Sequence, residues 1–196
     1  MRPATRTLRS LRAHGIGGRG EALVATLGQE PQVVTIALDL LLQQGRGVRE
    51  TVVVHTTSSA VLAGLQEIRR EFLLSYPSVR LRSVSVRGPA GRLDDFRSEA
   101  DVRSLLSALY RAVRDAKRAY DVVHLSLAGG RKVMSVAAMV VAQLLFGPED
   151  RVWHLLDEAP RPEPRGLRCG SPLSPDALLR TECIWIRNSP GPSCTP

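Results

Sequence analysis

The stretch DVVHLSLAGGRKVMSVAAMVVAQLLF, residues 121–146, decides the fold of this chain. It opens with an apolar run over residues 122–127, which is short enough for a strand buried on both faces. It closes with an apolar segment of helical length over residues 133–146. Between the two runs, Gly129 and Gly130 allow a sharp backbone turn and leave amide groups bare. The stretch therefore predicts a strand, a tight turn and a helix.

The turn carries two cations, Arg131 and Lys132, at the start of the predicted helix. Cations oppose the dipole at a helix N-terminus unless an anion binds there, so the pair predicts a phosphate site. The alternative is the ordinary strand-to-helix joint of any α/β domain. A Walker A loop has the form G-x-x-x-x-G-K-[ST], and here Arg131 separates the last glycine from the lysine. A nucleotide triphosphatase is therefore disfavoured.

Length and charge suggest a single domain with a polyanionic partner. The chain has 196 residues, which is typical of one domain with a full core. Its net charge of +8 and pI of about 10.4 favour an anionic ligand. A general arginine bias also explains the charge, since only Lys117 and Lys132 are lysines. An aromatic content of 4% argues against a stacking platform for single-stranded nucleic acid.

Cysteine usage and hydropathy exclude several other classes. The three cysteines, Cys169, Cys183 and Cys194, have neither C-x-x-C spacing nor histidine partners, so we expect no zinc site. Without a secretory signal, their odd number fits a reducing cytoplasm. No apolar run is long enough to span a bilayer. We therefore expect a cytoplasmic protein with no membrane partner, no metal and no cofactor.

Strand and helix patterns alternate along the chain. Strands are predicted at residues 21–26, 51–55, 79–86, 122–127 and 151–156, and helices at about 31–44, 59–74, 97–119 and 133–146. This alternation is typical of a Rossmann-like α/β fold, a parallel sheet with helices on both faces. Right-handed crossovers favour the strand order 3-2-1-4-5. We expect His124 and Trp153 in the core and the third strand, with its alternating arginines, at an edge.

Three segments follow from this pattern. Residues 1–20 are predicted to be a basic flexible extension, and residues 21–158 to be the Rossmann domain. Residues 159–196 form a proline-rich extension, in which 182–187 is predicted as one further strand or part of a hairpin. The first and fourth strands become neighbours where the winding of the sheet reverses, and ligands bind outside the carboxyl ends of strands at that point. The loops at residues 27–32 and 128–132 should therefore meet in one site.

The two loops resemble a known family. ATLGQEPQVV at residues 25–34 and LSLAGGRKVMS at 125–135 resemble the CRISPR-associated Rossmann-fold (CARF) family, and the likeness extends over residues 21–156. The resemblance implies a homodimer that binds a cyclic oligoadenylate across its two-fold axis. Some stand-alone members of the family are ring nucleases that cleave this messenger. We expect no effector domain after residue 156, which favours a degrading enzyme over a receptor.

The resemblance also implies which residues line the ring. The first loop would contribute Thr26, Gly28, Gln29 and Gln32, and the second Gly129, Gly130, Arg131, Lys132, Met134 and Ser135. In the implied reaction, a ribose 2′-hydroxyl attacks the adjacent phosphate and leaves a 2′,3′-cyclic phosphate, with no metal required. Lys132, with Arg131 beside it, would stabilise the charge on the phosphate. His55, at the end of its strand, is a candidate acid or base, and Thr56 and Thr57 are helix caps whose hydroxyls could reach an adenine.

Two alternatives stay open at this stage. One is a binding module of the same fold that senses or sequesters cyclic tetra- or hexa-adenylate without cleaving it. The other is a basic protein that binds duplex DNA or RNA through its surface charge, with an affinity that falls steeply with salt. The leading interpretation is a metal-independent ring nuclease, for which no long nucleic acid is required.

Overall fold

The computed structural model describes residues 18–155 and contains a five-stranded, all-parallel sheet. The strand order is β3-β2-β1-β4-β5, which confirms the predicted topology. The elements are β1 (Glu21–Leu27), α1 (Gln32–Gln43), β2 (Val48–His55), α2 (Ser59–Ser75), β3 (Arg80–Ser85), α3 (Glu99–Ala119), β4 (Val122–Ser126), α4 (Lys132–Leu145) and β5 (Arg151–Trp153).

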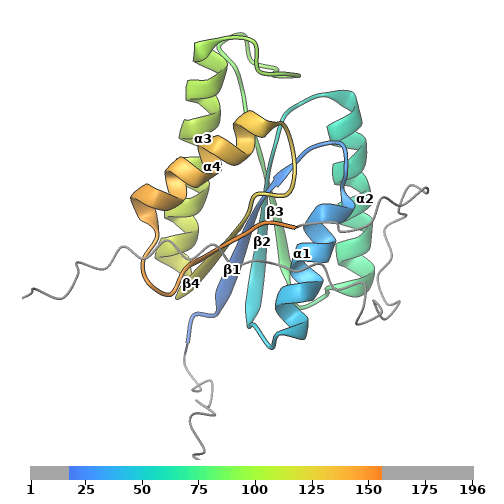
Figure 1. Ribbon diagram of the computed structural model, residues 1–196. Coiled ribbons are helices and arrows are strands. Elements are labelled where there is room, and N and C mark those ends of the chain that lie inside the picture. The colour runs from blue at the N-terminus through green and yellow to red at the C-terminus, as the bar shows by residue number, and fades with distance from the viewer. Residues whose placement is uncertain (1–17, 156–196) are drawn as a thin grey trace, which may run out of the picture.

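Helices cover both faces of the sheet. Helices α1 and α2 lie on one face, and α3 and α4 lie on the other (Figure 1). Each face has its own apolar core: one contains buried residues of α1 and α2, and the other contains those of α3 and α4. The central strand β1 is buried along its whole length, as expected for a strand with neighbours on both sides. Strands β1 and β4 are paired, so the loops that follow them leave the sheet side by side.

The second strand begins at Val48, three residues before its predicted start at Thr51. The predicted strand began too late because it left out the polar pair Arg49-Glu50. In the structure Glu50 is 2% exposed. Two arginines of the neighbouring edge strand neutralise it, with Arg80 at 2.7 Å and Arg82 at 3.3 Å from the Glu50 carboxylate. A buried carboxylate is tolerated here because it is paired.

Residues 1–17 and 156–196 lie outside the described part of the chain. The predicted basic extension, the proline-rich extension and the strand at 182–187 fall wholly or largely there. Within the described residues, no helix combines the length and hydrophobicity needed to cross a membrane. His124 and Trp153 lie in the core, as predicted, with exposed fractions of 0% and 8%.

Candidate functional site

A pocket of about 460 Å³ opens at the carboxyl end of the sheet, at the predicted switch point. Four loops line it, those that follow β1, β2, β3 and β4, together with the first turns of α1, α2 and α4. The lining residues are Leu27, Gly28, Gln29, Glu30, Val33, Thr56, Ser58, Ser59, Ala60, Val61, Asp94, Ala128, Gly129, Gly130, Arg131 and Met134.

The loops after β1 and β4 are in direct backbone contact, as the sequence predicted. A Cβ atom placed on Gly28 would lie 2.7 Å from the backbone of Gly130, and one on Gly129 would lie 2.0 Å from the carbonyl oxygen of Thr26. The Thr26 hydroxyl donates a hydrogen bond of 2.5 Å to the Gly129 carbonyl. Gly130 also has a φ of +93°, a conformation that glycine adopts without strain. The glycines are therefore needed to bring the two loops together.

The two cations of the second loop have different surroundings. Arg131 precedes α4, lines the pocket, and donates to Asp95 at 3.0 Å. Lys132 is the first residue of α4 and is exposed, and it does not line the pocket. Among residues 18–155, no ion pair is found for Lys132. Both cations lie at the N-terminus of α4, whose first turn borders the pocket.

The loop between β3 and α3 supplies a wall of the pocket that the sequence analysis did not assign to the site. Asp94 lines the pocket, and Asp95 pairs with Arg131. Thr57 holds this loop in place, because its hydroxyl accepts from the Leu93 amide at 2.7 Å and its own amide donates to the Leu93 carbonyl at 2.7 Å. No local sequence pattern marks these aspartates, because they lie well beyond the end of β3 at Ser85.

Three other predicted site residues, His55, Ser135 and Gln32, make hydrogen bonds to groups of the protein itself. His55 is 3% exposed, does not line the pocket, and its Nδ1 donates to the Thr56 carbonyl at 2.7 Å. Burial lowers the pKa of the His55 imidazole, with the hydrogen bond to Thr56 acting in the opposite direction. The Ser135 hydroxyl donates to the Leu127 carbonyl at 2.9 Å, and Gln32 donates to the Glu30 carboxylate. The assignments of His55, Gln32 and Ser135 to the site stay predictions.

The pocket lining contains charges of both signs. Arg131 and the glycine turn lie in the lining together with the carboxylates of Glu30 and Asp94. The N-terminus of α2 also opens here, where Ser58 caps the helix by accepting from the Val61 amide at 3.4 Å. Within residues 18–155, no group of three or more His, Cys, Asp or Glu side chains is placed to hold a metal ion.

The fold and the site define an open, doubly wound α/β protein with a glycine turn and two cations at its switch point. The family model of CRISPR-associated protein NE0113 matches residues 30–167, which is more than half of the chain. The chain therefore belongs to this CRISPR-associated family, which confirms the CRISPR association expected from the two loops. No curated protein matches the sequence.

Solved structures with a similar arrangement include protein VC1899 from Vibrio cholerae, with 15% identity and a TM-score of 0.48 over 69% of this chain and 30% of that chain. Can2 from Sulfobacillus thermosulfidooxidans, in complex with cyclic tetra-adenylate, has 10% identity and a TM-score of 0.43 over 69% and 32% of the two chains. A type III CRISPR defence DNA nuclease activated by cyclic oligoadenylate has 20% identity and a TM-score of 0.47 over 69% and 18%. The chain spans about a third or less of each of these proteins.

Proposed function

We propose that this protein is a metal-independent ring nuclease that binds and cleaves cyclic oligoadenylates. The substrate class comes from the CARF-like sequence of the two loops and from membership of a CRISPR-associated family. The observation that carries the proposal is the contact between Gly28 and Gly130, which joins both CARF-like loops in the wall of one pocket. A phosphate of the ring would bind the amides of the glycine turn, the guanidinium of Arg131 and the N-terminus of α4.

Cleavage in this proposal needs little from the protein beyond position and charge. The ribose 2′-hydroxyl of the substrate attacks the adjacent phosphorus in line, and the products are linear with 2′,3′-cyclic phosphate ends. Lys132 stabilises the phosphorane and donates a proton to the leaving 5′-oxygen. Lys132 is exposed at the first turn of α4, next to the pocket-lining Arg131, so its flexible side chain can turn toward a bound phosphate.

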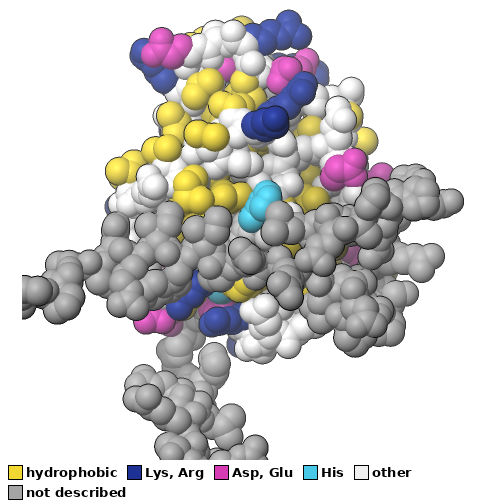
Figure 2. Space-filling model, viewed as in Figure 1, with side chains coloured by type: hydrophobic (Ala, Val, Ile, Leu, Met, Phe, Trp, Pro, Cys, Tyr) yellow, Lys and Arg dark blue, Asp and Glu magenta, His cyan; other side chains and the backbone are white. Residues whose placement is uncertain are grey.

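We place a second copy of the chain on α4. Three apolar side chains follow one another along this helix at a spacing of four residues: Val136, Val140 and Leu144, with exposed fractions of 64%, 41% and 69%. Figure 2 shows hydrophobic side chains gathered along this part of the surface. Because α4 begins at the glycine turn, a two-fold neighbour packed on this stripe would bring a second pair of loops close to the first. A homodimer of this kind presents two cation pairs to one ring.

Purified protein incubated with cyclic tetra- and hexa-adenylate in EDTA tests the proposal. We expect linear products with 2′,3′-cyclic phosphate ends for at least one ring, resolved by mass. We also expect Lys132→Ala to lower the single-turnover rate by about 100-fold or more and to weaken binding by less. Equal losses in binding and turnover would restrict Lys132 to phosphate binding.

A second candidate function is a binding module that holds the ring intact. The burial of His55 favours it, since the one histidine expected near the pocket is not exposed in its lining. Tight binding without any linear product, from either ring and in the presence or absence of Mg²⁺, would support this module over the nuclease.

A further inference from the structure

Asp94 and Asp95 are adjacent residues whose carboxylates have different partners. Asp95 accepts a hydrogen bond from Arg131 at 3.0 Å, whereas Asp94 faces the pocket. Adjacent Cα atoms are only about 3.8 Å apart, so Asp94 and the Asp95–Arg131 pair belong to the same part of the pocket wall, and Asp94 and Arg131 both line the pocket. A carboxylate repels phosphate. The Asp94 carboxylate can therefore face a bound ligand favourably only where the ligand offers it a hydrogen-bond donor close to that phosphate.

The backbone around Asp94 is fixed on several sides. The preceding residue, Leu93, is 5% exposed and is bonded to Thr57 through both its amide and its carbonyl. The carboxylate itself is 63% exposed. Its nearest contacts are long: the Thr57 hydroxyl at 3.5 Å and Arg92 at 3.8 Å. Asp94 is therefore held in position while retaining free acceptor capacity, which is the arrangement expected of a residue that meets a ligand.

A cyclic oligoadenylate has few donors to offer. The 3′- and 5′-oxygens of each ribose are esterified, so the donors are the ribose 2′-hydroxyl and the 6-amino group of adenine. The 2′-hydroxyl is on the carbon next to the one that bears the phosphate, whereas the amino group is on the far edge of the base. Asp94 is the sequence neighbour of the residue that contacts Arg131, and both Asp94 and Arg131 line the pocket. With a phosphate bound at Arg131, we therefore assign to Asp94 the donor that lies next to that phosphate, the 2′-hydroxyl.

From this we infer that Asp94 is the catalytic base of the cleavage reaction, an inference that rests on the proposed function. Its carboxylate accepts a hydrogen bond from the 2′-hydroxyl and takes the proton as the 2′-oxygen bonds to phosphorus. The bond between phosphorus and the 5′-oxygen breaks, and that oxygen receives a proton from the Lys132 ammonium. Asp94 then releases its proton to water and Lys132 regains one, so both groups return to their starting state.

A thermodynamic cycle on binding tests this contact without using turnover. The affinities of wild type and Asp94→Ala are measured for the ring, for the ring with 2′-deoxyribose and for the ring with purine in place of adenine. We expect 2′-deoxy substitution to weaken wild-type binding by about 10- to 100-fold and to leave Asp94→Ala binding almost unchanged. In Glu30→Gln, which alters the other carboxylate of the lining, the 2′-deoxy loss should equal that of wild type.

Turnover provides the second readout. Asp94→Asn keeps the size and an acceptor oxygen but cannot hold a proton, and we expect its single-turnover rate to fall by about 100-fold or more. Equal 2′-deoxy losses in wild type and Asp94→Ala, or coupling to the adenine amino group instead, would overturn the inference while leaving the ring nuclease in place. A wild-type protein that binds and cleaves no ring would overturn the proposed function together with it.

Discussion

Gly129 is the residue at which the site tolerates least change. A methyl group there would lie 2.0 Å from the Thr26 carbonyl oxygen, so Gly129→Ala must separate the two loops. We expect it to lower the free energy of unfolding by about 1 to 3 kcal/mol, as overpacking does, and to weaken ring binding. Urea unfolding and titration with the ring measure the two effects. Gly47→Ala is the control, because its methyl group would meet nothing within 4 Å; equal losses in both variants would contradict this account.

His55 gives the molecule a pH dependence of known sign. Its pKa is lowered by burial, so the folded state binds fewer protons at this histidine than the unfolded state, whose pKa is about 6.5. The contribution of neutral, buried His55 to the free energy of unfolding is therefore fully present above about pH 6.5. It is lost as the pH falls from there through the lowered pKa that His55 has in the folded state. His55→Asn keeps an N–H donor for the Thr56 carbonyl and does not titrate. We expect the urea midpoint of wild type to fall more between pH 7.5 and 5.5 than that of His55→Asn; identical shifts would refute this.

The sequence predicted those pocket-lining residues whose position follows from local chain geometry. Glycines and cations between a buried strand and a helix can be recognised within ten residues, and Gly28, Gly129 and Arg131 line the pocket. Asp94 and Asp95 were missed because their position depends on Thr57, which is 37 residues away from Asp94 along the chain. Their loop carries no periodicity, so only the folded chain shows that Asp94 lines the pocket and that Asp95 contacts Arg131.

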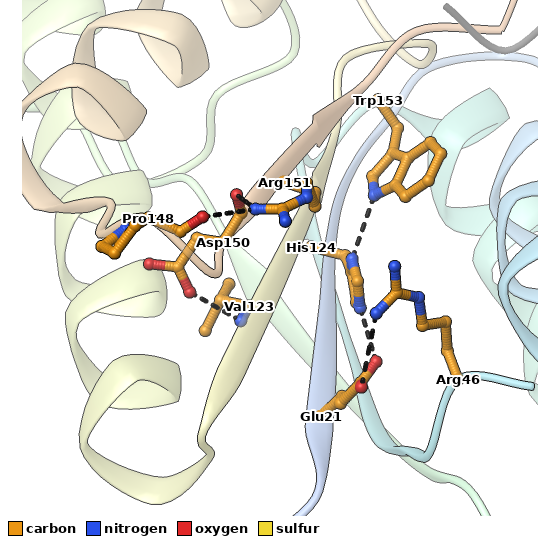
Figure 3. Close-up of polar contacts among 8 residues, drawn as sticks. All are labelled: Glu21, Arg46, Val123, His124, Pro148, Asp150, Arg151 and Trp153. Atoms are coloured by element: carbon orange, nitrogen blue, oxygen red, sulfur yellow. Dashed lines mark hydrogen bonds and ion pairs between the residues drawn. The ribbon is translucent and has the colours of Figure 1, made fainter. Parts of the chain in front are cut away.

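At the scale of elements, Asp150 fastens the short edge strand β5 to its neighbours. Its side chain is fully buried and accepts from the amides of Val123 at 2.9 Å and Gly147 at 2.7 Å, as well as from Lys117 (Figure 3 shows the contact with Val123). These bonds join β5 to β4 and to α3. On the opposite side of β4, His124 accepts from Trp153 at 3.0 Å and donates to Glu21 at 2.7 Å.

Removal of the Asp150 carboxylate should be costly, because two amides and a lysine lose their partner together. We expect Asp150→Ala to lower the free energy of unfolding by about 3 kcal/mol, as for other broken buried ion pairs. Asp115→Ala is the matched control: its carboxylate is 48% exposed and pairs with Arg114, so the change should stay within about 0.5 kcal/mol. Chemical denaturation measures both, and similar costs would show that Asp150 does not fasten β5.

Element types and their order were predictable because the strands are apolar runs and α3 is strongly amphipathic. The helix α3 also carries a complete capping box, in which the Ser98 hydroxyl accepts from the Asp101 amide and Asp101 accepts from the Ser98 amide. The start of β2 was not predictable, since the burial of Glu50 depends on arginines of another strand. Local patterns thus determine the elements, whereas paired buried charges determine where some of them begin.

For the whole molecule, the strand order followed from the handedness of the crossovers, which is why the meeting of two distant loops could be predicted. The surface that a second copy would cover could not be predicted in the same way. An apolar stripe on a helix indicates an interface only once the opposite face of that helix is known to be buried. Helix α4 packs Met134, Ala138 and Val141 into the core and leaves Val136, Val140 and Leu144 exposed. Our proposed homodimer assigns this second face to another copy of the chain.

That assignment predicts an association that the ring itself strengthens. We expect sedimentation velocity to show a dimer, with a dissociation constant that falls when cyclic oligoadenylate is added, because a ligand held by both copies favours the dimer. Val140→Glu would place two like charges at the two-fold interface and should weaken the dimer by roughly 100-fold or more. Leu73→Glu, at an 81% exposed position on α2, should leave it unchanged. A dimer sensitive to Leu73→Glu but not to Val140→Glu would move the interface to α2, and a monomer that binds one ring tightly would refute the two-fold site.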